Sequence, residues 1–291
     1  MLFIKAINNG NNILWISQKQ KMKGNVFMKK YRVLVTIIIV LSIVIIGTSN
    51  DAKKLYKASN LIIKSINVDE KKDNNETKKE KDILICIDAG HQEKGDSNLE
   101  PVAPGSYVKK ARVSSGATGV ATKKPEYILN LEASIVLKHI LEDKGYKVIM
   151  TRESHDVNIS NSERAIFANN NKADMVIRVH ADSLNNPSKT GASILIPAKE
   201  SKYTTNIYED SKACANLIEN KMKESGIQVN GVFERNDLTG FNWSQVPVVL
   251  VEMGFLSNYN EDQMMSNPEY QRKLMESISN GLDEYFINKW I

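Results

Sequence analysis

The sequence predicts an α/β protein: a single domain whose mainly parallel, mixed sheet carries helices on both faces, preceded by an N-terminal membrane anchor or signal. From residue 82 onward, short apolar runs alternate with segments of helical periodicity, which is the pattern of parallel strands joined by crossover helices. A nearly unbroken aliphatic run covers residues 33–47. Charge is spread unevenly along the chain, which separates this N-terminal region from the domain.

The two regions differ in the sign of their charge. Residues 1–81 hold 16 Lys and Arg against 6 Asp and Glu, whereas residues 82–291 hold 23 against 28. The net charge of +5 therefore combines a leader at +10 with a domain at −5. Binding to phosphates needs clustered positive charge, so the acidic domain argues against nucleic acid as a partner.

The N-terminal region is predicted to direct export. Residues 1–32 form a basic leader, residues 33–48 an apolar segment and residues 49–81 a polar stalk. Basic residues before an apolar segment keep its amino end in the cytoplasm, so we expect the domain to be extracytoplasmic, in a bacterial cell envelope. The segment is short for a spanning helix, but there is no Ala-x-Ala cleavage site and no cysteine for lipidation, which favours an uncleaved anchor over a cleaved signal. Met28 begins a run typical of a natural start, so residues 1–27 need not be translated.

The domain, residues 82–291, alternates strands with helices. Pro125 is tolerated at a helix start and Gly145 ends that helix, while Ser160 and Glu163 form a capping box. The expected strands are residues 83–88, 146–151, 174–180, 191–197 and 246–252, and the expected helices are residues 125–145, 160–170, 201–225 and 268–288.

One segment of the domain lacks any periodic pattern. Residues 92–124 are polar and contain several glycines, and a loop of this length is usually functional or mobile. The two cysteines fall inside regular elements, Cys86 in a strand and Cys214 in a helix. We therefore predict two buried free thiols rather than a disulfide.

Two histidines and a glutamate stand where predicted strands end. His91 closely follows the first strand, and His180 and Glu252 end two later strands. The carboxyl ends of parallel strands form the ligand crevice of an open α/β sheet. Two histidines plus one glutamate are an established ligand set for catalytic zinc, with the fourth position left to water. One shared metal ion is therefore our hypothesis.

The carboxylate ligand has three candidates: Glu126, Glu132 and Glu252. Glu126 occupies the first turn of its helix, where it could face the crevice or simply complement the helix dipole. Glu132 points about 240° around the helix axis from Glu126, so the two cannot face one site. His139 and His155 do not end strands and are expected to be structural.

The domain carries several separated motifs. They are Ile-Asp-Ala-Gly-His at 87–91, Glu126 with Asn130-Leu131, Thr151-Arg152, Glu163-Arg164, Val-His-Ala-Asp at 179–182, and Val-Glu-Met-Gly-Phe-Leu-Ser-Asn at 251–258. In order and spacing, over residues 82–286, they resemble the zinc-dependent N-acetylmuramoyl-L-alanine amidases of the amidase type 3 family. The resemblance implies one Zn²⁺ ion held by His91, Glu126 and His180, with Glu252 as the catalytic carboxylate. It also implies cleavage of the amide joining muramic acid to L-alanine in peptidoglycan.

The chain departs from many members of that family after His91. Gln92, Glu93 and Lys94 stand where glycines are common, and the following segment is longer. The zinc ligands that the resemblance implies are all present, so the departure does not affect metal binding. It affects instead the access to the site and the preference for substrate. An activating protein partner that orders the site is a further hypothesis, and a vegetative or a sporulating wall fits equally.

Three more residues are candidates for supporting the site. Asp88 could orient an imidazole, a contact that ligating histidines commonly make, or it could cap the turn after its strand. Arg178 and Arg235 could meet the carboxylates of an acidic stem peptide, or they could be ordinary solvated or sheet-spanning arginines.

Two rival functions fit the same residues. A zinc peptidase would cleave bonds within the stem peptide, and a non-catalytic module would bind the wall without cleaving it. A carboxylate such as Glu252, at the end of an apolar strand, is costly to bury without a purpose or partner. That cost argues against the non-catalytic module.

Overall fold

The computed structural model describes residues 80–289, which belong to the compact unit Thr77–Ile291. The predicted leader and apolar segment, and the stalk up to residue 79, lie outside the described residues. Within residues 80–289, no helix combines the length and the apolar character that crossing a membrane requires.

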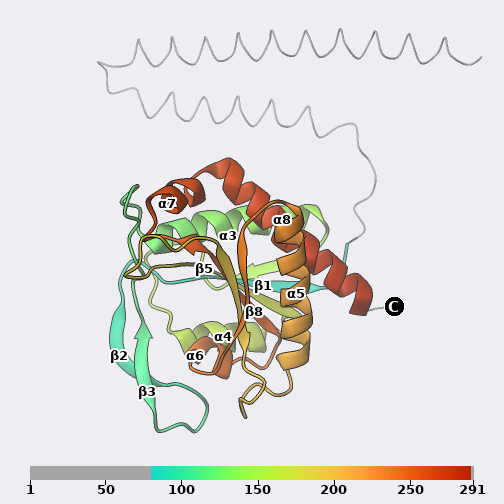
Figure 1. Cartoon of the computed structure of the whole chain (residues 1–291). Helices are drawn as coiled ribbons and strands as arrows, with labels where there is room; N and C mark the ends of the chain where they lie inside the picture. Colours follow the sequence, from blue (N-terminus) through green and yellow to red (C-terminus); the bar gives the residue numbers. More distant parts are fainter. Residues whose placement is uncertain (1–79, 290–291) are drawn as a thin grey trace, which may run out of the picture. The chain divides into compact units, whose positions relative to one another are not determined.

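A six-stranded sheet forms the centre of this unit (Figure 1). Its strand order is β4-β1-β5-β8-β6-β7, and every neighbouring pair is parallel except β6 with β8. The prediction of a mainly parallel, mixed sheet is therefore confirmed. The strands are β1 (Leu84–Ala89), β4 (Lys147–Met150), β5 (Met175–Asp182), β6 (Ala192–Pro197), β7 (Val229–Arg235) and β8 (Val248–Phe255).

Helices cover both faces of the sheet, as predicted. Helices α3, α5 and α8 pack together over one face, where the larger hydrophobic cluster lies, and α4 and α6 pack over the other. The bounds of these helices are α3 (Glu126–Asp143), α4 (Asn161–Asn170), α5 (Tyr208–Glu224), α6 (Thr239–Asn242) and α8 (Pro268–Lys289).

Alternation along the strands decides which face receives the polar residues. Ile177 and Val251 belong to the cluster beneath α3, α5 and α8, whereas Val176 and Leu250 belong to the smaller cluster beneath α4 and α6. Successive side chains of a strand point to opposite faces of the sheet, so even-numbered positions of these strands face α4. The polar residues that share this face are Asp88, Arg178, His180 and Glu252.

The two cysteines are buried on opposite faces of the sheet. Cys86 lies in the smaller cluster and Cys214 in the larger one, and both are free thiols. The prediction of two unpaired thiols is confirmed. Burial raises the pKa of each thiol well above its usual value, so both stay protonated at neutral pH.

The segment expected as one long loop contains a hairpin. Strands β2 (Asp96–Pro101) and β3 (Lys109–Val113) pair antiparallel and project from one side of the unit (Figure 1). At the tip, the Ser106 N–H donates to the Ala103 carbonyl (3.1 Å) across Pro104 and Gly105. Proline followed by glycine is a strong turn signal. The expectation of a continuous loop is therefore wrong, although the sequence contained the sign of a turn.

Other boundaries differ in smaller ways. The helix expected from residue 201 begins at Tyr208 because residues 201–207 form consecutive turns, closed by bonds such as Ile207 N–H to the Thr204 carbonyl (3.1 Å). Thr204, Thr205 and Asn206 are poor helix formers. Strand β7 and helices α6 and α7 (Tyr259–Met265) were not predicted.

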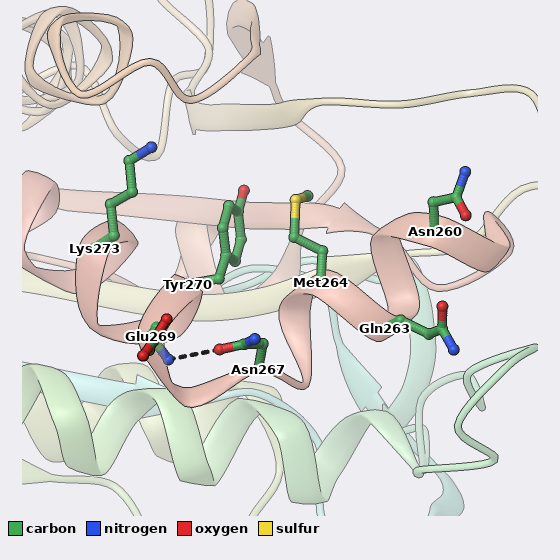
Figure 2. A pocket seen from close by; sticks show the side chains of 7 residues that line it. All are labelled: Asn260, Gln263, Met264, Asn267, Glu269, Tyr270 and Lys273. Carbon is green, nitrogen blue, oxygen red and sulfur yellow. Dashed lines mark hydrogen bonds between the residues drawn. The ribbon is translucent and has the colours of Figure 1, made fainter.

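Helix α7 joins β8 to α8 and holds a distant loop. Asp262 accepts hydrogen bonds from the backbone N–H groups of Ala121 and Thr122 (2.7 and 2.8 Å), which fixes the segment that leads into α3. Figure 2 shows the junction with α8, where the Asn267 side chain accepts from the Glu269 N–H (2.8 Å). The Asp262 contacts tie the segment before α3 to α7, whereas the Asn267 contact is local to the start of α8.

Candidate active site

His91, Glu126 and His180 converge on one point. Glu126 Oε1 lies 3.1 Å from His91 Nε2 and 3.4 Å from His180 Nδ1. The two imidazole ring centroids are 4.8 Å apart, and the rings are nearly perpendicular at 79°. One ligand atom from each residue lies within 4.8 Å of the others, so the three side chains could hold a single metal ion.

Each of the three residues comes from a different element. His91 follows β1 with a left-handed backbone (φ 61°), which turns the chain away from the end of the sheet. Glu126 is the first residue of α3, and His180 lies in β5. Glu132 is exposed on α3 and pairs with Lys124 (2.6 Å), so of the two helix glutamates only Glu126 reaches the histidines.

Two glycines leave room for this cluster. A Cβ atom on Gly90 would collide with the His180 ring. A Cβ atom on Gly116 would lie 2.7 Å from Glu126 Oε2 and 3.0 Å from His91 Cδ2, and Gly116 also has a left-handed backbone (φ +83°). A side chain at either position would therefore displace a member of the cluster.

Glu126 is buried and held in its charged form. Its carboxylate accepts hydrogen bonds from the Ala117 N–H (2.9 Å), the Asn130 side chain (3.1 Å) and the Ala181 N–H (3.2 Å). Burial alone would raise the pKa of Glu126, but the two imidazoles outweigh burial and hold that pKa well below its usual range. An ionised carboxylate is the form that ligates metal.

The histidines are likewise prepared as ligands. Burial lowers the pKa of His180 to about 4, so its ring is neutral at neutral pH, and its Nε2 is buried without a hydrogen-bond partner. His91 Nδ1 lies 2.9 Å from the Ser114 carbonyl, which leaves His91 Nε2 to face the cluster. A neutral His180 imidazole beside a charged carboxylate, with His91 Nε2 facing both, fits a divalent metal ion.

Glu252 lies directly beside this cluster. It is the register partner of His180 across the β5–β8 pair. The residue is partly exposed, but its Oε2 is buried and has no hydrogen-bond partner. Burial and the neighbouring charges of Glu126 and Asp182 raise the pKa of Glu252 well above its usual value. A carboxyl with these properties binds a proton more strongly than a solvated glutamate does, as expected of a general acid–base group.

A pocket of about 270 Å³ opens over the cluster on the α4 face of the sheet. His91, His180 and Glu252 line it together with the sheet residues Leu195 and Leu250. Strand β3 and the segment after β7 also line it, and they meet where Lys110 Nζ donates to the Asp237 carbonyl (2.7 Å). The charged residues that line the pocket are Lys110, Arg178, Arg235, Asp237 and Glu252.

Asp88 forms a buried charged network instead of an imidazole contact. Its carboxylate accepts hydrogen bonds from Thr151 Oγ1 (2.6 Å), Arg164 Nη1 (2.8 Å) and Arg178 Nε (2.8 Å). Burial would raise the pKa of Asp88, but the two guanidinium groups hold it well below its usual range. The expectation that Asp88 orients a histidine is therefore wrong, because two arginines and a threonine occupy its oxygens.

We expect Asp88→Asn to lower the free energy of unfolding by about 3–5 kcal/mol, because loss of one partner leaves buried charges uncompensated. Arg164 and Arg178 would keep their charges with no carboxylate between them. Urea unfolding of the full chain measures this. Asp82→Asn is the matched control: Asp82 pairs with Lys147 at the surface and should leave the midpoint unchanged. Equal midpoints for both variants would refute a stabilising role of the network.

The two candidate arginines have different surroundings. Arg178 is buried and committed to Asp88, with a longer contact to Asn161 (3.5 Å). Arg235 is partly exposed at the pocket wall and pairs with Asp237 through two hydrogen bonds (2.8 and 2.9 Å). Of the two arginines, Arg235 is therefore the one whose side chain a ligand in the pocket can reach, in exchange for its bonds to Asp237.

The histidines expected to be structural stand outside the cluster. His139 is exposed on α3, 3.7 Å from Glu142, and the His155 ring packs edge-on against Tyr127 at 5.3 Å. Sequence reasoning gave no role to Ser114 or Gly116, which touch the cluster from the segment without periodicity. The absence of a pattern there left no signal to find them.

The fold and the site together have the arrangement of a metal-dependent hydrolase: an α/β domain in which His91, Glu126 and His180 could hold a metal ion, with an unpaired glutamate beside them. Residues 85–284 match the model of the N-acetylmuramoyl-L-alanine amidase family. The chain belongs to this family.

Individual relatives agree with this assignment. The probable cell wall amidase LytH of Staphylococcus saprophyticus is 25% identical over 206 residues, which cover 71% of this chain and 59% of that protein. The crystal structure of the amidase Ami1 of Mycobacterium smegmatis has a TM-score of 0.63 at 23% identity, covering 71% and 98% of the two chains. The CwlD amidase of Clostridioides difficile, solved in complex with the GerS lipoprotein, has a TM-score of 0.57 at 23% identity, covering 71% and 99%. The two structures show the same fold.

Proposed function

We propose that this chain hydrolyses the amide between N-acetylmuramic acid and L-alanine of the peptidoglycan stem peptide, using one zinc ion. One observation carries the proposal: two imidazoles and an ionised carboxylate meet at one point, and the unpaired carboxyl of Glu252 lines the same pocket as the two imidazoles. His91, Glu126 and His180 would hold the zinc ion. Family membership supplies the substrate class.

The reaction divides between the metal and the chain. When bound, zinc lowers the pKa of a water molecule toward about 7 and can polarise the amide carbonyl. Glu252 accepts a proton from the attacking water, and it passes that proton to the departing amine of L-alanine. Its pKa, raised by burial and by the charges of Glu126 and Asp182, makes this carboxyl a stronger base than a solvated glutamate, which suits it to take the proton from water.

Arg235 is the residue we assign to the stem peptide. It lines the pocket, it is partly exposed, and its present partner Asp237 is also on the pocket wall. A stem-peptide carboxylate could replace Asp237 at the guanidinium, since the fork of arginine suits carboxylates. Arg178 is held by Asp88, so its contribution is the positive charge it adds beneath the pocket.

The setting follows from the substrate. Peptidoglycan lies outside the cytoplasmic membrane, so we place the domain, residues 82–291, in the cell envelope, anchored through residues 33–48. An activating protein partner remains part of the proposal, supported by the CwlD structure in which GerS is bound. Co-expression with candidate envelope proteins, followed by activity measurement, tests that part.

Digestion of purified peptidoglycan by the full chain tests the reaction. We expect mass analysis to show free stem peptides that begin with L-alanine, together with glycan strands of unchanged length. A zinc peptidase would instead release peptide fragments and leave L-alanine on the muramic acid. Binding without any product would support the non-catalytic rival.

A further inference from the structure

A second pocket lies beside the active site, between α4, α6 and the tip of the β2–β3 hairpin. Its volume is about 340 Å³. Two partly buried aromatic rings and a group of amide side chains line it. The aromatic and amide residues of the lining are Tyr203, Trp243, Asn169, Asn170, Asn242 and Gln245.

No aspartate, glutamate, lysine or arginine lines this pocket, although charged residues make up 25% of the chain. The active-site pocket, by contrast, is lined by five charged residues. Transfer of a charged group from water into a site that cannot pair it is costly, so the uncharged lining selects a neutral ligand. Aromatic rings with a few placed polar groups are typical of small-molecule sites.

Hydrogen bonds hold the Trp243 and Asn169 part of the lining in place before any ligand binds. The indole Nε1–H of Trp243 donates to the Pro101 carbonyl (2.9 Å), which fixes the ring against the hairpin. Asn169 accepts from the Gln245 N–H and donates to the Trp243 carbonyl, both at 2.9 Å. Lys202 lies 5.0 Å from the centroid of the Tyr203 ring. A preformed site loses less entropy on binding.

The Asn242 side chain has an acceptor atom, Oδ1, that no donor of the described residues satisfies. The residue is 3% exposed and lines the pocket, and its side-chain N–H donates to the Asn236 carbonyl (3.1 Å). Its Oδ1 is buried and has no partner. An unpaired buried acceptor costs free energy, which a ligand hydroxyl or amide N–H would recover.

The two pockets are neighbours. Gly240 lines the active-site pocket and Asn242 lines the second one. Two residues span at most about 7 Å of chain, so the pockets are separated by little more than one turn of α6. The hairpin also lines both, through Lys110 in one and Pro104 in the other. A glycan strand that bound in both pockets would have to pass only the short helix α6.

The pocket between α7 and α8 has a different character. Its volume is about 490 Å³, and Figure 2 shows that its lining includes Glu269 and Lys273 as well as Tyr270 and Met264. Charges of both signs lie on this surface, and only one aromatic ring contributes. The uncharged lining, which suits a neutral ligand, therefore distinguishes the pocket at α6 from the pocket between α7 and α8.

We propose that the pocket between α4, α6 and the hairpin binds a neutral N-acetylated sugar of the glycan strand, next to the muramic acid whose amide is cleaved. The apolar face of a pyranose ring would pack on the Tyr203 ring, and its hydroxyl or acetamido N–H groups would donate to Asn242 Oδ1. This inference rests on the proposed function, because the glycan strand is what both pockets would share.

Calorimetric titration of the full chain with N,N′,N″-triacetylchitotriose tests the site without any hydrolysis. We expect the wild type to bind, Tyr203→Ala to bind about tenfold more weakly and Tyr203→Phe to retain binding, because the ring supplies the contact. Tyr259→Ala is the matched control, since Tyr259 is 61% exposed on α7, outside this pocket. No binding by the wild type, or equal binding by wild type and Tyr203→Ala, would overturn the proposal.

Kinetics separate this inference from the proposed function. On glycan strands that carry stem peptides, Tyr203→Ala should raise KM about tenfold and leave kcat unchanged, because the reacting groups are intact. An equal loss of kcat would place Tyr203 in the catalytic machinery and refute a separate sugar site. If the wild type binds the trisaccharide but cleaves no amide, the proposed function fails and the sugar site stands.

Discussion

Replacement of Glu252 by glutamine is expected to lower kcat for amide hydrolysis by about 10²–10⁴-fold, the usual contribution of a general acid–base group. Glutamine keeps the size of the side chain but cannot accept a proton from water or pass it to the leaving amine. The metal ligands are untouched, so the zinc content of the purified variant should equal that of the wild type. Metal analysis and release of L-alanine amino termini from peptidoglycan measure the two quantities.

The stability of the same variant separates catalysis from folding. Burial and the charges of Glu126 and Asp182 raise the pKa of Glu252, so its ionised form destabilises the folded state at neutral pH. Glutamine removes that charge, and we expect the unfolding midpoint to stay level or rise. Glu234→Gln is the matched control, because Glu234 is exposed on β7 and outside the pocket lining. Full activity of the Glu252 variant would remove this residue from the mechanism.

The sequence could predict the strand-end residues because two simple rules act together. Parallel strands bring their carboxyl ends to one edge of the sheet, and alternation sends every second side chain to the same face. His180 and Glu252 obey both rules and lie in register on β5 and β8. The position of Glu126 at a helix start was equally visible, but its choice over Glu132 came from the family resemblance.

The partners of Asp88 could not be predicted in the same way. Thr151, Arg164 and Arg178 lie 63, 76 and 90 residues along the chain from Asp88. The hydrophobic periodicity of a single helix or strand carries no information about contacts between residues so far apart in the sequence. These contacts form only when α4 and the neighbouring strands pack together. The network replaces the expected imidazole contact since two guanidinium groups compensate a buried carboxylate more strongly than a neutral ring does.

Strand β7 and helix α6 were not predicted because neither has a clear hydrophobic pattern. Strand β7 is an edge strand with no fully buried residue and with Gly231 inside it, so it shows neither an apolar run nor clean alternation. Helix α6 has only four residues, too short to show a period. Both nevertheless shape the pockets, because the segment from Arg235 to Gly240 forms a wall of the active site.

Removal of a single metal ligand is expected to lower both the zinc affinity and the rate of amide hydrolysis strongly. Loss of a group that merely hydrogen-bonds to a ligand costs about 10–100-fold in metal affinity. Loss of a ligand itself should therefore cost more, because the site has only three protein donors. His91 and Glu126 allow the comparison, since one is partly exposed and the other buried within the cluster.

We therefore expect His91→Ala and Glu126→Ala to be purified with little zinc and to lose amide hydrolysis, whereas Glu132→Ala keeps both. Glu132 is the matched control because it lies on the same helix as Glu126 but pairs with Lys124 at the surface. Mass spectrometry of bound metal gives the readout, and chelation of the wild type followed by added zinc shows whether the loss is reversible. Zinc lost from Glu132→Ala but retained in Glu126→Ala would overturn the ligand assignment. Full activity of metal-free wild-type protein would overturn the metal-dependent mechanism itself.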